Sequence, residues 1–295
     1  MGTELIIFSD ERKKIEDRWD YHGLLFVRKS AFPRFVEALR ADRKVQGYFH
    51  ELKFGRLDKK GKGETYRLSQ RWVDRFLDDL HTSEFGLSFS VTGVDTLKLD
   101  YALFGDDETS KGKYATIYNR FFRATLKGST KFLFPDDLVI IDRIFHDHEG
   151  NLEKNGYFDW HAIHQLGKDP MNLKFGCRVV DFVDSDHAVE LTSPEASECI
   201  QFVDVLLGAI THCIHATNTR NIGQKQLAIS ILPAVEDALK SPYRNGENNH
   251  FRRLSISHFP RNHSTEFSED IAPGEYYRLD CDNFRNMVFG QGSLF

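Results

Sequence analysis

The feature that most constrains the fold is an almost wholly apolar run from residue 200 to residue 210, which carries one carboxylate, Asp204, in its middle. The residues Thr192-Ser193-Pro194-Glu195 precede this run and are typical of a helix start. A charge on a buried helix costs on the order of several kcal/mol unless it is neutralised, paired or bound to a metal. The sequence therefore predicts a central helix whose Asp204 either is hydrogen-bonded within the core or faces a functional site.

Three further carboxylates occupy comparable positions. Asp10 follows the apolar run 5–8, Asp142 ends the run 138–141, and Glu51 lies within an aromatic stretch. Two of the three therefore end short strand-like runs. Open α/β sheets bind ligands beyond strand ends, so we expect these carboxylates to share one site with the helix carboxylate.

Composition sets broad limits on the class of protein. A chain of 295 residues with 40% hydrophobic content and 25 Phe can bury an ordinary core. The net charge of −5 argues against nonspecific coating of nucleic acid but leaves room for a local basic groove. The four Cys form no CxxC pair, which is typical of free thiols in a reducing compartment. No apolar run approaches the roughly 18 residues of a membrane span, so we expect a cytoplasmic protein without membrane contact.

Hydrophobic periodicity predicts alternating strands and helices, and hence an α/β fold. Residues 1–240 are expected to form one domain, and residues 241–295 a C-terminal extension packed on the same domain. The expected strands are 3–9, 22–28, 85–94, 138–142, 177–182, 253–257 and 276–279, and the expected helices are 31–40, 65–80, 115–126, 158–167, 194–215 and 224–239. Residues 11–20 are expected to be a polar connection and 146–151 a turn.

Four motifs in this order resemble those of the domain of unknown function 3800 family, which is similar to the ribonuclease H and integrase-like superfamily. The resemblance spans about residues 4–216. The motifs are Asp10-Glu11 after the first strand, Glu51-x-Lys53, the strand Val139-Ile140-Ile141-Asp142, and Ile200-Gln201-x-x-Asp204 on the long helix.

The resemblance implies a ribonuclease H-like mixed β-sheet flanked by helices, with carboxylates gathered at one edge as a divalent-metal site. By this resemblance Asp10, Glu51, Asp142 and Asp204 are the metal ligands and catalytic residues, with Lys53 as a further catalytic candidate. The family usually continues Asp-Glu-Ser-Gly after the first strand. Here the chain reads Asp10-Glu11-Arg12-Lys13, which alters the turn and brings cations towards the metal.

The expected cofactor is Mg²⁺ or Mn²⁺. These hard cations take oxygen ligands and keep several waters, so a few carboxylates suffice without a full protein cage. A pair of such ions can activate the attacking water and stabilise the leaving oxygen of a phosphodiester. Four converging carboxylates without a metal would repel one another, because each ionised neighbour raises the pKa of the others.

Three residues are secondary candidates for the site. Glu11 is expected to point away from Asp10 if the strand continues. His212 and His215 lie on the helical face of Asp204, where they either carry protons or cap the last turn of the helix. Lys53 either pairs with Glu51 or a phosphate, or is an ordinary surface lysine.

The leading hypothesis is a metal-dependent nuclease acting on DNA or RNA. The residues expected to contact nucleic acid are Arg12, Lys13, Lys59, Lys60 and Lys62. The resemblance further implies a role in phage defence or in a mobile element, with a protein partner from such a system. The alternatives are a catalytically degenerate subunit of the same fold that binds nucleic acid or protein, and a phosphohydrolase with an enclosed pocket for a small nucleotide.

Overall fold

The computed structural model describes residues 2–15, 18–104, 110–148, 173–176, 180–215, 220–240 and 253–259. Within these residues, one mixed sheet has the strand order β5-β4-β1-β2-β3-β7, and β6 also pairs with β4. The strands are β1 (Thr3–Ile15), β2 (Trp19–Arg28), β3 (Ser88–Asp95), β4 (Val139–Asp147), β5 (Leu173–Phe175), β6 (Asp181–Val183) and β7 (Leu254–Phe259). The expected α/β class is confirmed.

The directions and registers of the strands determine which of their residues lie side by side. β1, β2 and β3 are successively antiparallel, whereas β4 runs parallel to β1. In the register of β1 and β4, Ser9 lies opposite His146. The next residues, Asp10 and Asp147, therefore lie beside each other where the parallel pairing of β1 and β4 ends.

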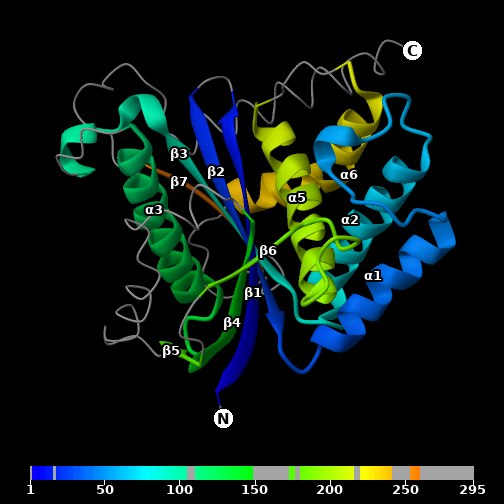
Figure 1. Ribbon diagram of the computed structural model, residues 1–295, viewed down its shortest axis with the longest axis horizontal. Coiled ribbons are helices and arrows are strands. Elements are labelled where there is room, and N and C mark those ends of the chain that lie inside the picture. The colour runs from blue at the N-terminus through cyan, green and yellow to red at the C-terminus, as the bar shows by residue number, and fades with distance from the viewer. Residues whose placement is uncertain are drawn as a thin grey trace.

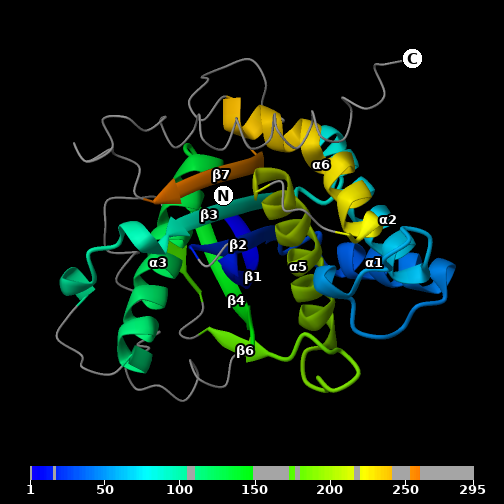
Figure 2. The ribbon, with the colours of Figure 1, turned by 90° about the horizontal axis from the view of Figure 1, so that it is seen from above.

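Helices cover both faces of the sheet (Figures 1 and 2). One face carries α1, α2, α5 and α6, and the other carries α3. The helices are α1 (Phe32–Gln46), α2 (Glu64–Thr82), α3 (Ser110–Leu133), α5 (Pro194–His215) and α6 (Ile222–Lys240), with short 3-10 turns η1 (Phe54–Arg56), η2 (Thr96–Lys98) and η3 (Tyr101–Phe104). The sheet is therefore the middle layer of three.

The alternation of side chains along β1 assigns its residues to the two faces. Ile6 and Phe8 belong to the core beneath α5, whereas Leu5 and Ile7 belong to the core beneath α3. Continuing this alternation places Asp10 on the α5 face. Glu11, the next residue, falls on the α3 face.

The predicted central helix is confirmed as α5, which packs against the sheet and α6. By length and hydropathy α5 could span a membrane, but 94% of its most apolar window is buried inside the protein. Its Gly208 permits a close approach, because a Cβ there would lie 2.2 Å from the Phe54 ring. The segment that precedes η1 is thereby held against the helix.

Two predicted strand ends are wrong. β1 does not stop at residue 9 but continues to Ile15, because Asp10, Glu11 and Arg12 pair with β2 in the antiparallel ladder. β4 does not end at Asp142 but continues to Asp147, because Phe145 to Asp147 pair with β6. Charged side chains do not prevent this pairing, since the ladder is made by the backbone.

Part of the predicted extension forms a strand of the sheet. β7 pairs in parallel with β3, and Arg253 forms an ion pair with Asp79 of α2. Cys199 and Cys213 are buried free thiols. The helix predicted at 158–167, Cys177, Cys281 and most of residues 241–295 lie outside the described residues.

Candidate functional site

Three carboxylates lie near one another beside α5, where the parallel pairing of β1 and β4 ends. Asp10 is only 8% exposed. Burial raises the pKa of Asp10 well above its usual value, and the ionised Asp147 and Asp204 raise it further. The repulsion that Asp147 and Asp204 exert on Asp10 places the three side chains in one electrostatic environment, which we call the carboxylate cluster.

Of the two alternatives for Asp204, the hydrogen bond within the protein is present. Its Oδ2 accepts a hydrogen bond from the backbone N–H of Phe54 at 2.6 Å. Burial raises the pKa of Asp204, and the Phe54 N–H and the cations of Arg12 and Lys53 only partly oppose this shift. Asp204 therefore fixes the chain before η1 while remaining a member of the cluster.

Asp147 is the residue that the sequence analysis missed. Burial raises its pKa to about 6, with Lys53 lowering it and Glu11 raising it. The available signal was the apolar pair Ile144 and Phe145, which resumes the strand pattern after Asp142. Extending the strand over that pair would have put Asp147 at its end.

Asp142 does not join the cluster. Its Oδ1 accepts from Lys29 Nζ at 2.8 Å, and its side chain is 30% exposed. Asp147 lies five positions further along β4, a distance of about 16 Å along the strand. The aspartate of β4 that lies beside Asp10 is therefore Asp147, the last residue of the strand, and the prediction of Asp142 is wrong.

Glu51 and Lys53 lie at the margin of the cluster. They form an ion pair at 2.8 Å, and Glu51 also accepts from Ser185 Oγ at 2.8 Å. Burial raises the pKa of Glu51, but hydrogen bonds from Lys53 and Ser185 outweigh it, so the pKa is lowered. The pairing of Glu51 with Lys53, one of the two alternatives for Lys53, is therefore present, although this segment is not a strand.

Arg12 crosses from β1 to α5. Its Nη1 donates to Thr211 Oγ1 at 2.8 Å and to the Gly208 carbonyl at 3.1 Å, and its guanidinium lies 5.1 Å from the centre of the Phe54 ring. Burial lowers the pKa of Arg12, against the opposing effect of Asp204 and Asp10. Arg12 therefore binds the helix and supplies positive charge near the cluster.

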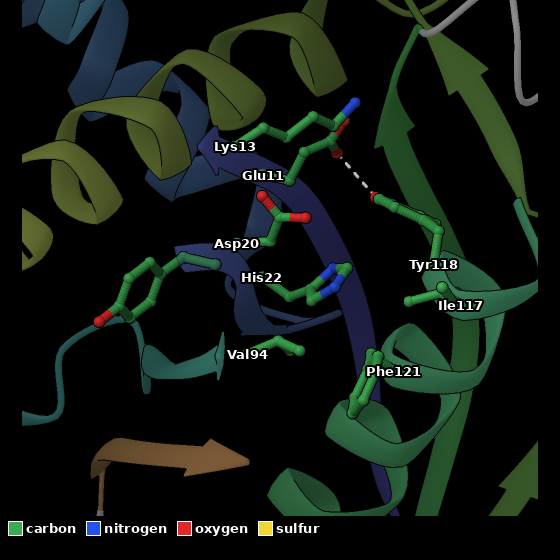
Figure 3. Close-up of a pocket in the computed structure, with 9 residues that line it drawn as sticks. Glu11, Lys13, Asp20, His22, Val94, Ile117, Tyr118 and Phe121 are labelled. Atoms are coloured by element: carbon green, nitrogen blue, oxygen red, sulfur yellow. Dashed lines mark hydrogen bonds and ion pairs between the residues drawn. The ribbon is translucent and has the colours of Figure 1, made fainter. Parts of the chain in front are cut away.

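Glu11 and Lys13 lie on the opposite face of the sheet (Figure 3). They form an ion pair at 2.8 Å, and Tyr118 Oη donates to Glu11 at 2.7 Å. Together with His22 they line a pocket of about 20 Å³, which has room for about one water molecule. This pocket is too small for a nucleotide, and the sheet lies between the side chains of Glu11 and Lys13 and that of Asp10.

His212 and His215 are buried near Arg12, at 4% and 5% exposure. Burial lowers the pKa of each to about 4, and the charge of Arg12 lowers it further. His215 Nε2 lies 2.7 Å from Tyr21 Oη. Both imidazoles are therefore neutral at pH 7.

Lys59, Lys60 and Lys62 are exposed on the loop between η1 and α2. The loop has a defined shape because the Asp58 carboxylate accepts from the backbone N–H groups of Lys60, Lys62 and Gly63. It also contacts the start of α6 through the Ile222 N–H and the Lys59 carbonyl. The three lysine side chains are thus presented to solvent on a fixed turn.

The donor chemistry of the cluster fits Mg²⁺ or Mn²⁺. It consists of carboxylate oxygens whose repulsion a cation would relieve, and both ions keep waters in their coordination shells. Among the residues that the structure describes, no three or more His, Cys, Asp or Glu side chains form a ready-made metal cage. The fit therefore rests on the donor type and on the crowding of negative charge.

No protein-family model, curated protein or solved structure matches this chain.

Proposed function

We propose that this protein is a metal-dependent nuclease of ribonuclease H-like fold that hydrolyses phosphodiester bonds of DNA or RNA. The observation that carries the proposal is the buried Asp10 beside Asp147, where the parallel pairing of β1 and β4 ends, with Asp204 of the central helix nearby. A buried carboxylate whose pKa is raised by two neighbouring aspartates is costly to the fold, and such groups are found where function requires them. A mixed sheet with helices on both faces agrees with this fold.

The metal ligands in this proposal are Asp10, Asp147 and Asp204, with Glu51 beside them. Bound Mg²⁺ or Mn²⁺ supplies charge neutralisation at the phosphate and activation of a water. Lys53 is held by Glu51 and is 36% exposed, so its ammonium can also meet a phosphate oxygen. The fixed loop carrying Lys59, Lys60 and Lys62 offers positive charge to the remainder of a polyanion.

A subunit of the same fold that only binds nucleic acid or protein is the second candidate. It is favoured by the cations already present, because Arg12 and Lys53 each oppose the raised pKa of Asp204 without any metal. In this case Arg12 and Lys53 would balance the negative charge of the cluster in place of a metal ion. Metal binding separates the two candidates.

The test uses two aspartates of one strand. Thermal unfolding is measured for wild type, Asp147→Asn and Asp142→Asn, each titrated with Mn²⁺ and with Mg²⁺. A ligand that binds only the folded state raises the unfolding midpoint in a saturable way. We expect wild type and Asp142→Asn to respond and Asp147→Asn to lose the response.

Cleavage assays on single-stranded DNA, double-stranded DNA and RNA then follow with the same three proteins. Cleavage by wild type and Asp142→Asn, lost in Asp147→Asn, supports the nuclease. An equal midpoint response in all three proteins, or none in wild type, rejects the metal site and leaves the binding subunit.

A further inference from the structure

Gln201 lies on α5 three residues before Asp204 and is fully buried. Its Oε1 accepts from the backbone N–H of Leu52 at 2.6 Å and from Arg43 Nη2 at 2.6 Å. Asp204 accepts from the N–H of Phe54 in the same way. Two side chains on one face of α5 therefore hold alternate amides of the segment that contains Lys53.

The amide nitrogen of Gln201 reaches a second loop. Its Nε2 donates to the Ser185 carbonyl at 2.5 Å and lies 2.9 Å from His187 Nδ1. The hydroxyl of the same Ser185 donates to Glu51. Gln201 thus ties together the two chain segments that surround the Glu51 carboxylate.

Arg43 of α1 completes this arrangement. It is 2% exposed, its Nε donates to Glu198 at 2.7 Å, and its Nη1 donates to the His50 carbonyl at 2.9 Å. The guanidinium also lies 5.0 Å from the centre of the Trp72 ring. A buried arginine in an ion pair adds little net stability compared with apolar packing. The hydrogen bonds of Arg43 therefore serve to fix the geometry of the segments that it contacts.

We propose that Arg43 and Gln201 are positioning residues that hold Glu51 and Lys53 against the carboxylate cluster and thereby set its affinity for a divalent cation. The inference rests on the proposed function. Both residues act through the backbone amides and carbonyls of the two loops. Neither one touches a residue of the cluster.

The experiment compares wild type with Gln201→Leu, which keeps the side-chain size but removes every hydrogen bond of the amide. Gln70→Leu is the matched control, because Gln70 is a partly buried helix glutamine that bonds Asp74 and Ser230 away from the cluster. Mn²⁺ binding is measured by electron paramagnetic resonance of the free ion. Amide hydrogen exchange at Leu52 reports the position of the segment without any metal.

We expect the amide hydrogen of Leu52 to exchange faster in Gln201→Leu than in wild type. We also expect this variant to bind Mn²⁺ about 10- to 100-fold more weakly, which is the usual loss when a residue that supports a metal site is replaced. Gln70→Leu should match wild type in both measurements. If Gln201→Leu does not fold, Arg43→Lys takes its place. This variant keeps the charge facing Glu198 but cannot supply every hydrogen bond of the guanidinium.

The possible outcomes separate the two proposals. If wild type binds Mn²⁺ and Gln201→Leu binds it within twofold of wild type, the positioning role is overturned and the nuclease proposal stands. If wild type itself does not bind Mn²⁺, the proposed function fails and the positioning role fails with it. Weaker binding in Gln70→Leu as well would also overturn the inference, since the effect would then be general.

Discussion

Asp10 of β1 and Asp147 of β4 lie side by side where the parallel pairing of the two strands ends, one residue past the paired Ser9 and His146. The pKa of Asp10 is raised by burial and by the ionised Asp147. The sheet thus brings together two carboxylates whose repulsion does not stabilise the fold. This relationship makes the stability of the protein depend on the charge of each aspartate.

Neutralising Asp147 should stabilise the metal-free protein. Its pKa is about 6 in the folded state and 3.8 in the unfolded state, so the folded state holds the proton more strongly. Its stabilising contribution is therefore present below pH 3.8 and is lost as the pH rises through about 6. At pH 7, in a chelator, urea unfolding of Asp147→Asn should show a free energy of unfolding about 1–3 kcal/mol above wild type.

Asp142→Asn is the control for this prediction. It removes only a partly exposed ion pair with Lys29, which contributes about 0–1 kcal/mol. We expect its free energy of unfolding to be equal to or slightly below that of wild type. A metal-free Asp147→Asn that is less stable than wild type would contradict the strained cluster.

Arg12→Met should destabilise the fold. The substitution removes hydrogen bonds to Thr211 and to the Gly208 carbonyl, and it also removes positive charge near Asp10 and Asp204. We expect a loss of about 1–3 kcal/mol in urea unfolding at pH 7.

Arg56→Met provides the comparison. Arg56 also pairs with a carboxylate, Glu51, but its side chain is 69% exposed, so its loss should change stability by about 0–1 kcal/mol. Equal effects of the two substitutions would show that the bonds of Arg12 to α5 contribute no more than a surface ion pair.

His22→Phe should reduce the sensitivity of the protein to acid. Burial lowers the pKa of His22 to about 4 from 6.5, so the unfolded chain binds the proton first. The stability contributed by the neutral ring is present above pH 6.5 and is lost as the pH falls towards 4, by up to about 3 kcal/mol. Free energies of unfolding at pH 7 and pH 5 should therefore differ less for His22→Phe than for wild type, and an equal difference would reject the assignment.

The sequence was sufficient to predict those elements whose own pattern of apolar and polar side chains shows how deeply they are buried. The apolar run around Asp204 predicted the buried helix α5, because a helix that is apolar on all sides must be covered on all sides. The sequence was insufficient to predict where a strand ends when backbone pairing with a neighbouring strand determines that end. Residues 11–14 are charged and suggest a loop, yet β1 continues through them to Ile15 because β2 pairs with Glu11, Arg12 and Ile15.

The same reason explains the misplaced aspartate. The pair Asp142 and Arg143 interrupts the apolar pattern of β4, and only the neighbouring strands β1 and β6 determine that the strand continues. The position of Glu51 depends likewise on contacts distant in sequence, namely Gln201 with Leu52 and the Ser185 hydroxyl. Such contacts leave no periodic signal in the chain.

The basic loop allows a prediction about nucleic-acid binding that does not depend on catalysis. Asp58 holds the backbone of this loop, so replacing the side chains of Lys59, Lys60 and Lys62 with Gln should leave its shape intact. Each lysine that neutralises a phosphate on single-stranded DNA contributes about 0.7 to the slope of log affinity against log salt concentration. The triple variant should therefore bind a single-stranded oligonucleotide more weakly, with a slope smaller by about 2.

The matched variant replaces three exposed lysines on other elements, Lys44 of α1, Lys131 of α3 and Lys174 of β5. It changes the net charge by the same amount and so controls for long-range attraction. Binding is measured by fluorescence anisotropy in a chelator, over a range of salt concentrations. Equal slopes for the two triple variants would mean that the loop between η1 and α2 is only a solvated surface, whereas a smaller slope for the loop variant alone identifies it as the surface that follows the phosphate backbone.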